Sequence, residues 1–509
     1  MSRPLPCLLL LIGLSSGALD ARATTFTVTR TDDPSPDDCL PGDCSLREAT
    51  LAANANDPAA GTDRIQLAAA SYTLVRGALT CTQDLELVGS GSAATHVTTD
   101  VELFANQHDH TLSVRGLSMQ TTVSNVLTMG DDGHLVLDDV SVPVGGGSVQ
   151  SYGTGTSLEV RDSDLRDTLR CNQSTGPCTV VDSSLLNFYV VPASGGPTVL
   201  IQRSIVDGDL DPGATPAPAV VLHAGTTAIQ DSTITHTAAL RILDNPGQQV
   251  SLLRVHYVDN SGPVSTDIDA DVSIADSEFR DNVGRALRVD GDANWIVRGS
   301  SFINNQVDDS AGGAIVVQGG ASVHIENSTF SGNSFSTAAA GNGARGAAIG
   351  YHGDNGSVSV VLRHVTIVPP TVMPFGIDGT AIGGFDGASV DVDVSNSIVR
   401  GSCRFDGGAL RNHAGNIESP GDTCGFDGSS QVSVPPADVA LGTLGDHGGP
   451  TPTYEPAGTS VAVDAGGAPQ CLEFDQRGYL RPAGSGCDAG AVEVDAIDDV
   501  IFADGFDQA

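Results

Sequence analysis

Short apolar runs alternate with polar residues along most of the chain, and one such pattern repeats. It is clearest in LEVRDSDL (158–165), VSIADSEF (272–279), WIVRGSSF (295–302), VHIENSTF (323–330) and VDVSNSIV (392–399). With the sixth residue taken as an anchor, aligned anchors fall at residues 117, 140, 163, 183, 204, 232, 255, 277, 300, 328, 365 and 397. Most anchors are about 22 residues apart, an interval typical of a solenoid.

The apolar positions around each anchor predict the geometry of one repeat. The residues five and three positions before the anchor and two positions after it are apolar, with Thr227 as the exception. The first two alternate as in a strand. The second and third of these positions are five residues apart, an odd number, which would place them on opposite faces of a straight strand. All three can therefore face one core only if the chain turns a corner near the anchor.

Residues 284–289 and 312–317 provide a third short strand in their repeats. Two or three strands with corners describe one coil of a parallel β-helix. The sequence therefore predicts an all-β fold, a right-handed parallel β-helix of about twelve coils, forming a rod roughly 55 Å long. Four asparagines, each five positions after an anchor, predict a hydrogen-bonded ladder or alternatively a polar binding strip; they are Asn260, Asn282, Asn305 and Asn333.

The N-terminus has the pattern of a secretory signal peptide. Arg3 precedes an apolar run from Leu5 to Leu14, and the small residues of Ala21-Arg22-Ala23 predict cleavage between Ala23 and Thr24. The run is far shorter than the ~18 residues that a membrane span needs. We expect a mature chain with no transmembrane segment, secreted or displayed on the surface of a Gram-negative bacterium.

Export predicts oxidised cysteines. Pairing of near neighbours gives Cys39–Cys44, Cys171–Cys178, Cys403–Cys424 and Cys471–Cys487, and it leaves Cys81 without a partner. Free thiols or a metal site are the alternatives, although the chain has no C-x2-C pair of the kind that zinc sites favour.

The segment Cys44-Ser45-Leu46-Arg47-Glu48-Ala49 resembles the CSLREA signature of exported bacterial proteins, except that Thr50 follows where an aliphatic residue is common. Ser45 and Glu48 also match a capping box. They predict a short helix, ending near Asn54, that covers the first coil.

The C-terminal part resembles the choice-of-anchor Q domain. The resemblance is carried by residues 444–451, 463–466, 475–478, 481–482 and 487–493. It implies a secreted or surface-displayed β-helix protein and supplies no catalytic residues. Five charged residues here predict buried salt bridges that close the last coils, with an enzyme site as the alternative; they are Asp475, Arg477, Arg481, Asp488 and Glu493.

These signatures divide the chain into five parts. We expect a signal peptide (1–23), a CSLREA-like cap region (24–95), a parallel β-helix (96–405), a disulfide-tied closing region like the choice-of-anchor Q domain (406–495) and an acidic tail (496–509).

The composition narrows the possible functions. The chain has 62 acidic and 24 basic residues, a net charge of -38, and every basic residue is arginine. Without lysine, a Walker P-loop and Schiff-base chemistry are excluded. The acidity disfavours a nucleic-acid partner, because phosphate binding needs clustered basic residues.

Two D-x-D-x-D runs are candidate Ca²⁺ sites, and Ca²⁺ is the one cofactor that the sequence suggests. They comprise Asp207, Asp209 and Asp211, and then Asp267, Asp269 and Asp271. Val272 follows the second run where an EF-hand turn needs glycine. Two histidine groups are weaker candidates: the H-x-H pair His108 and His110 for a metal, and His236 and His256 near Asp231 and Asp259 for an Asp/His cluster. Solvated turn residues are the alternative for both.

No acid–base pair stands out for catalysis, so we designate no catalytic residue. The sequence favours a non-catalytic, adhesin-like monomer that binds a polysaccharide or another cell-surface partner. The long inter-coil loops at 207–218, 335–345 and 369–387 are the candidate binding regions. The alternative is a polysaccharide lyase or glycoside hydrolase acting on an acidic polysaccharide.

Overall fold

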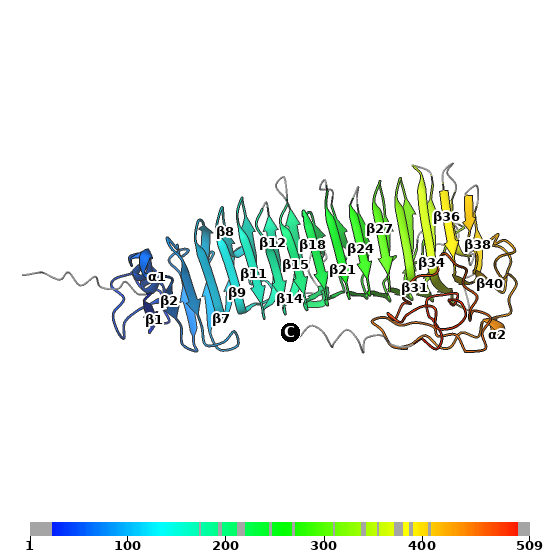
Figure 1. The fold of residues 1–509 in the computed structure, drawn as a ribbon. Helices are drawn as coiled ribbons and strands as arrows, with labels where there is room; N and C mark the ends of the chain where they lie inside the picture. Colours follow the sequence, from blue (N-terminus) through cyan, green and yellow to red (C-terminus); the bar gives the residue numbers. More distant parts are fainter. Residues whose placement is uncertain are drawn as a thin grey trace, which may run out of the picture.

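The computed structural model describes residues 23–172, 175–191, 196–210, 219–243, 247–266, 270–308, 311–336, 343–353, 356–370, 380–385, 390–405 and 409–496. In these residues the chain coils into a long rod of parallel strands (Figure 1). Each coil contributes strands to three faces of the rod, which we name faces A, B and C. The predicted all-β fold, a parallel β-helix, is confirmed.

Face A carries the residues five and three positions before each anchor. Its strands are β1 (Thr25–Thr27), β2 (Asp63–Gln66), β4 (Leu85–Val88), the first halves of β7 (Thr111–Thr121) and β9 (His134–Val142), β11 (Ser157–Arg161), β13 (Cys178–Val181), β15 (Thr198–Gln202), β18 (Thr226–Gln230), β21 (Gln249–Leu253), β24 (Asp271–Ala275), β27 (Asn294–Arg298), the first halves of β31 (Ser322–Ser331) and β34 (Val358–Val368), β36 (Val390–Ser395) and β39 (Ala409–Asn412).

Face B follows the anchor. It contains β3 (Ser71–Leu74), β5 (His96–Thr99), the second halves of β7 and β9, the starts of β12 (Asp164–Asn172) and β14 (Ser184–Val191), β16 (Ile205–Asp207), β19 (Thr233–Thr235), β22 (His256–Val258), β25 (Glu278–Arg280), β28 (Ser301–Ile303), the second halves of β31 and β34, β37 (Ile398–Arg400) and β40 (Ile417–Ser419).

Face C completes each coil. It contains β6 (Phe104–Gln107), β8 (Asn125–Met129), β10 (Ser148–Tyr152), the ends of β12 and β14, β17 (Val220–Leu222), β20 (Leu240–Ile242), β23 (Val264–Thr266), β26 (Leu287–Val289), β30 (Ile315–Gln318), β33 (Ile349–His352), β35 (Thr380–Phe385) and β38 (Ser402–Arg404). The short strands β29 (Gln306–Val307) and β32 (Ser334–Phe335) pair separately.

The corner between faces A and B explains the odd step in the sequence pattern. The residue before the anchor adopts the left-handed conformation in coil after coil, with φ of 52° at Asp139, 47° at Asp162 and 52° at Asp182. This conformation turns the chain, so apolar residues on both sides of the corner point inward. Aspartate, asparagine and glycine tolerate it better than other residues, which accounts for their frequency at this position.

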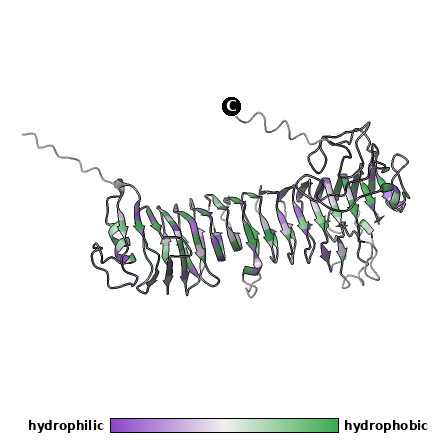
Figure 2. Ribbon diagram, turned by 90° about the horizontal axis from the view of Figure 1, so that it is seen from below, coloured by the Kyte–Doolittle hydropathy of each residue, from purple (hydrophilic) through white to green (hydrophobic). Residues whose placement is uncertain are grey.

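The core is one continuous column of stacked apolar side chains. Parallel register places equivalent residues above one another, as for Val250, Val272 and Trp295 on face A. On face B the rings of Phe279, Phe302 and Phe330 stack with centroids 4.9 and 4.7 Å apart. Hydrophobic and hydrophilic residues alternate along the strands in Figure 2.

Polar side chains form two ladders at the corners. The predicted asparagine ladder is present: Nδ2 of Asn282 donates to Oδ1 of Asn305 at 2.7 Å, and Nδ2 of Asn305 donates to Oδ1 of Asn333 at 2.9 Å. These asparagines are buried, so they satisfy backbone and side-chain groups and do not form a binding strip. The anchor serines form a second ladder, in which each backbone N–H donates to the hydroxyl of the next serine.

The front of the rod is covered by α1 (Leu46–Asn54), whose N-terminus carries the predicted capping box of Ser45 and Glu48. A short 3₁₀ turn, η1 (Pro58–Ala60), follows. The stack of paired strands extends beyond the twelve predicted repeats at both ends. Strands β1, β2 and β4 come from residues 24–95, and β39 and β40 follow the last anchor. No helix in the described part of the chain is long and apolar enough to cross a membrane.

Residues 421–496, here called the closing segment, cover the far end and return along face B (Figure 1). They contain one short helix, α2 (Pro436–Val439), and otherwise turns, bends and isolated β-bridges. Disulfides join the four predicted pairs, Cys39–Cys44, Cys171–Cys178, Cys403–Cys424 and Cys471–Cys487. Cys81 is buried and has no disulfide partner among the described residues, and burial raises its pKa to about 12.

Candidate functional site

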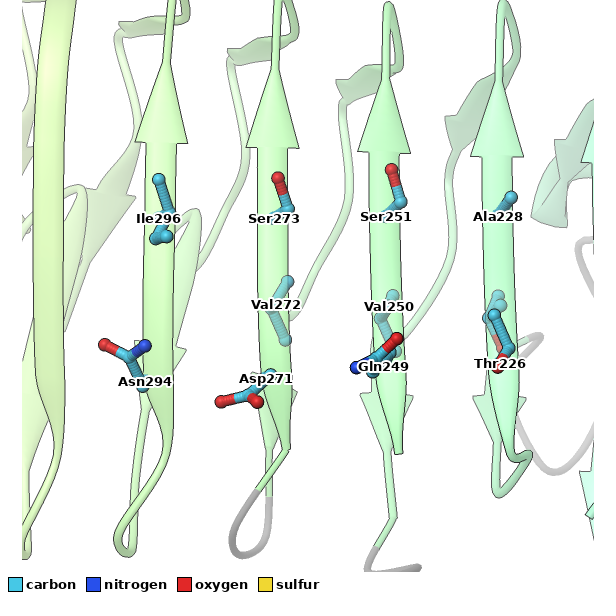
Figure 3. Close-up of a pocket in the computed structure, with 11 residues that line it drawn as sticks. Thr226, Ala228, Gln249, Val250, Ser251, Asp271, Val272, Ser273, Asn294 and Ile296 are labelled. Carbon is cyan, nitrogen blue, oxygen red and sulfur yellow. The ribbon is translucent and has the colours of Figure 1, made fainter. Parts of the chain in front are cut away.

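A groove of about 350 Å³ runs across the outer side of face A, over β18, β21, β24 and β27. Figure 3 shows two rows of outward side chains along it. The first row consists of Ala228, Ser251, Ser273 and Ile296, and the second consists of Thr226, Gln249, Asp271 and Asn294.

The groove exists because small residues are stacked in register. Ala228 pairs with Ser251, and Ser251 pairs with Ser273, so three consecutive strands present only a methyl or hydroxymethyl group. The second row carries the hydroxyl of Thr226 and the longer amide and carboxylate side chains of Gln249, Asp271 and Asn294. The result is a shallow floor bordered on one side by hydrogen-bonding groups.

The described lining of the groove is mostly uncharged. Among its described lining residues, the ionisable group is Asp271, and the other polar groups are hydroxyls and amides. These groups both donate and accept hydrogen bonds. A few placed polar groups beside apolar surface are typical of small-molecule and carbohydrate sites. Paired carboxylates of the kind that glycoside hydrolysis needs are not found among these lining residues.

Charges gather on face A beyond the groove, where they neutralise one another. Glu326 contacts His324 at 3.0 Å and Arg298 at 2.8 Å, and Arg363 lies 3.8 Å away. The hydrogen bond from His324 is the main cause that lowers the pKa of Glu326 to about 2, with Arg298 adding to the effect. This cluster is a structural ion-pair network between coils.

The first predicted Ca²⁺ run is arranged around a histidine. Asp207 ends β16, and Asp209 lies in the 3₁₀ turn η2 (Gly208–Leu210). Nδ1 of His236 lies 2.9 Å from Asp207, and Nε2 lies 3.6 Å from Asp209. The hydrogen bond to Asp207 raises the pKa of His236 above its ordinary value. Asp211 lies outside the described residues.

Only one residue of the second predicted Ca²⁺ run lies among the described residues. Asp271 borders the groove at the start of β24, whereas Asp267 and Asp269 lie outside the described residues. The Ca²⁺ assignment therefore stays a prediction for both runs. The candidate loops 207–218, 335–345 and 369–387 also lie largely outside the described part of the chain.

The Asp/His cluster expected from His236, His256, Asp231 and Asp259 has different partners. Asp231 contacts Arg254 at 2.5 Å, and His256 contacts Glu278 at 3.2 Å. Both contacts run between neighbouring coils, and Asp259 acts on His236 through its charge. His108 and His110 do not join a third potential ligand among the described residues.

The charged motifs of the closing segment form buried salt bridges, as predicted. Arg481 contacts Glu493 at 2.9 Å with both side chains fully buried, and Arg477 contacts Asp475 at 2.8 Å. Gln476 reaches across to face B, where its amide donates to Ser301 and accepts from Thr329. The ion pairs hold the closing segment together internally, and Gln476 attaches it to the rod.

Sequence reasoning missed the groove. The sequence feature that corresponds to the groove is the outward-facing residue between the two core positions of face A, in four consecutive repeats. There Ala228, Ser251 and Ser273 are small where other coils carry Glu159, Leu200 or His324. An alignment of outward positions coil by coil would reveal such a run.

Comparison with known proteins supports the architecture. The profile of the family described as "right handed beta helix region" matches residues 195–362. The fold is a right-handed parallel β-helix. A comparison with curated proteins finds no match.

The matching solved structures are distant in sequence and in superposition. The A-module of the Azotobacter vinelandii mannuronan C-5 epimerase AlgE6 is 13% identical with a TM-score of 0.35, covering 72% of this chain and 94% of that one. The A-module of the epimerase AlgE4 from the same organism is 15% identical with a TM-score of 0.28, covering 68% and 95%. The pectate lyase Pel9A is 13% identical with a TM-score of 0.27, covering 93% and 96%.

Proposed function

We propose that this protein is an exported, non-catalytic, monomeric rod that binds a neutral polysaccharide at a cell surface through the groove on face A. The groove itself carries the proposal. It is open and spans four strands, so it suits an extended chain more than a compact ligand. Its hydroxyl and amide groups complement the hydroxyls of a sugar.

The charge of the protein favours a neutral ligand. The net charge is -38, and the one ionisable residue among the described groove residues is the acidic Asp271. A polyanion would be repelled by both. Export is supported by the signal-like N-terminus and by four disulfides, which persist in oxidising compartments.

Binding is tested by titrating residues 24–509 with neutral and acidic polysaccharides, with and without Ca²⁺. We expect saturable binding of a neutral polysaccharide without new reducing ends or unsaturated products. Ser251→Trp fills the groove floor and is expected to weaken binding at least about tenfold, equivalent to about 1.4 kcal/mol.

Thr179→Trp is the matched control, because Thr179 also points outward on face A but lies two strands before the groove. Its affinity should stay close to that of the wild type. Equal loss in both variants would contradict the assignment to the groove. Product formation would favour the lyase or hydrolase alternative.

A further inference from the structure

A buried cluster of potential metal ligands lies where the closing segment meets the rod. It consists of His364, Cys471 and Cys487, whose ligand atoms all lie within 4.8 Å of one another. Among the described residues it is the one group of three such side chains of histidine, cysteine or acidic type that comes this close. The other three disulfides have no such neighbour in that part of the chain.

The histidine belongs to the rod and is held in a fixed orientation. His364 occupies the corner between faces A and B with φ of 50°, and its side chain is fully buried. Asn396, at the same corner of the next coil, places Nδ2 3.0 Å from Nε2 of His364. The backbone N–H of Leu472 also points at Nε2, at 3.4 Å.

Two N–H groups directed at one ring nitrogen require that nitrogen to carry a lone pair. A ring that accepts these bonds at Nε2 and carries its proton on Nδ1 is neutral. A neutral imidazole nitrogen is the form that binds metal ions. Nδ2 of Asn396 also lies 4.0 Å from Sγ of Cys487, so this amide group contacts both the imidazole and one of the two sulfurs.

The cysteines belong to the closing segment and form a disulfide with each other. A phosphine reductant gives the bond two electrons and leaves as phosphine oxide. Water supplies the oxygen to phosphorus and two protons to the sulfurs. A divalent metal then displaces these protons and binds two thiolates.

We propose that the dithiol form of this cluster is a Zn²⁺ site made by Cys471, Cys487 and His364. Two thiolates and one imidazole are a ligand set that zinc favours. The two thiolate charges balance the ion, which suits a buried position. Metal binding at Nε2 would displace both the Asn396 amide and the Leu472 N–H from the lone pair.

The zinc site and the disulfide would connect different parts of the protein. The disulfide joins two residues of the closing segment, whereas zinc would also join that segment to His364 of the rod. The dithiol form is the one that a newly made chain has before oxidation, so zinc and oxidation would compete for the same sulfurs.

The proposal is tested on full-length mature protein reduced with a phosphine, with Zn²⁺ added and cysteine alkylation followed residue by residue by mass spectrometry. We expect Zn²⁺ to slow alkylation of Cys471 and Cys487 at least about tenfold, and a chelator to reverse it. Cys403 and Cys424, which form a pair without a histidine, serve as internal controls.

His364→Gln should abolish this protection, whereas His134→Gln, at an exposed position on face A, should not. Cys471→Ser provides a second variant, in which His364 is intact and protection of Cys487 should be lost. Circular dichroism reports whether each reduced protein keeps its β-structure. Protection that is absent, that is equal at all cysteines, or that survives in His364→Gln would overturn the proposal, as would loss of β-structure without protection.

Discussion

At the scale of single residues, Asp488 shows how burial in the closing segment affects stability. Its side chain is almost inaccessible, and burial raises its pKa from 3.8 to about 6. Backbone N–H groups of Asp464 and Val494 donate to it and partly oppose this shift. The folded pKa lies above the unfolded one, so the stabilising contribution is fully present below about pH 4 and is lost as the pH rises through about 6.

Replacement of Asp488 by asparagine removes this titration. We expect the wild type to lose up to about 3 kcal/mol between pH 4 and pH 7 relative to Asp488→Asn. Denaturant unfolding of both proteins at the two pH values measures the difference. Asp422→Asn, at an exposed position, should keep the wild-type dependence, and an identical pH profile in Asp488→Asn would contradict the expectation.

The sequence predicted that the charged residues here are structural but did not predict all of their partners. Arg481 and Glu493 are close in sequence, and their opposite charges suggest a pair. Gln476, in contrast, bonds to Ser301 and Thr329, more than a hundred residues earlier. Such a contact depends on how far the closing segment returns along the rod, and no local pattern encodes that distance.

At the scale of elements, one strand shows the contrast between inward and outward positions. On β31, Ile325 is fully buried in the core, whereas Ser322 points outward at the start of the strand. Ile325→Asp would place an unpaired charge among stacked apolar side chains. The cost of burying it is several kcal/mol or more.

We therefore expect Ile325→Asp to unfold the coils around β31 or to prevent folding. Ser322→Asp, with the same new charge, should change stability by less than about 1 kcal/mol. Thermal unfolding followed by circular dichroism compares the two. An Ile325→Asp protein that melts like the wild type would refute the coil register.

The strands of faces A and B were predictable because the repeat fixes which side chains face inward. The groove was not, since its residues differ only in size from those of other outward positions. The partners of His236 were also missed: the sequence places it near Asp231, but strand pairing brings β16 beside β19 and so brings Asp207 to it.

At the scale of the whole molecule, the rod needs both ends covered, because unpaired strand edges invite association with other chains. The helix α1 covers one end and the closing segment covers the other. A chain ending at residue 420 would expose the edges of β39 and β40 and uncover Ser301 and Thr329.

We expect such a truncated protein to self-associate, while the protein of residues 24–509 stays monomeric. Sedimentation velocity at several protein concentrations measures this. Equal sedimentation of the two proteins at all concentrations would show that the closing segment does not protect the end.

The sideways path of the closing segment also limits how the rod can change in evolution. Gln476 is attached to Ser301 on β28, and Ala491 is attached to Thr366 on β34. The part of the segment between these two attachment points has a fixed length, so it fixes the number of coils that it can span. Coils before β28 can be duplicated or deleted as whole units, which changes the length of the rod. An extra coil between β28 and β34 would instead increase the distance between the two attachment points by about 4.8 Å. Length variation among related rods should therefore be concentrated in the first two thirds of the molecule.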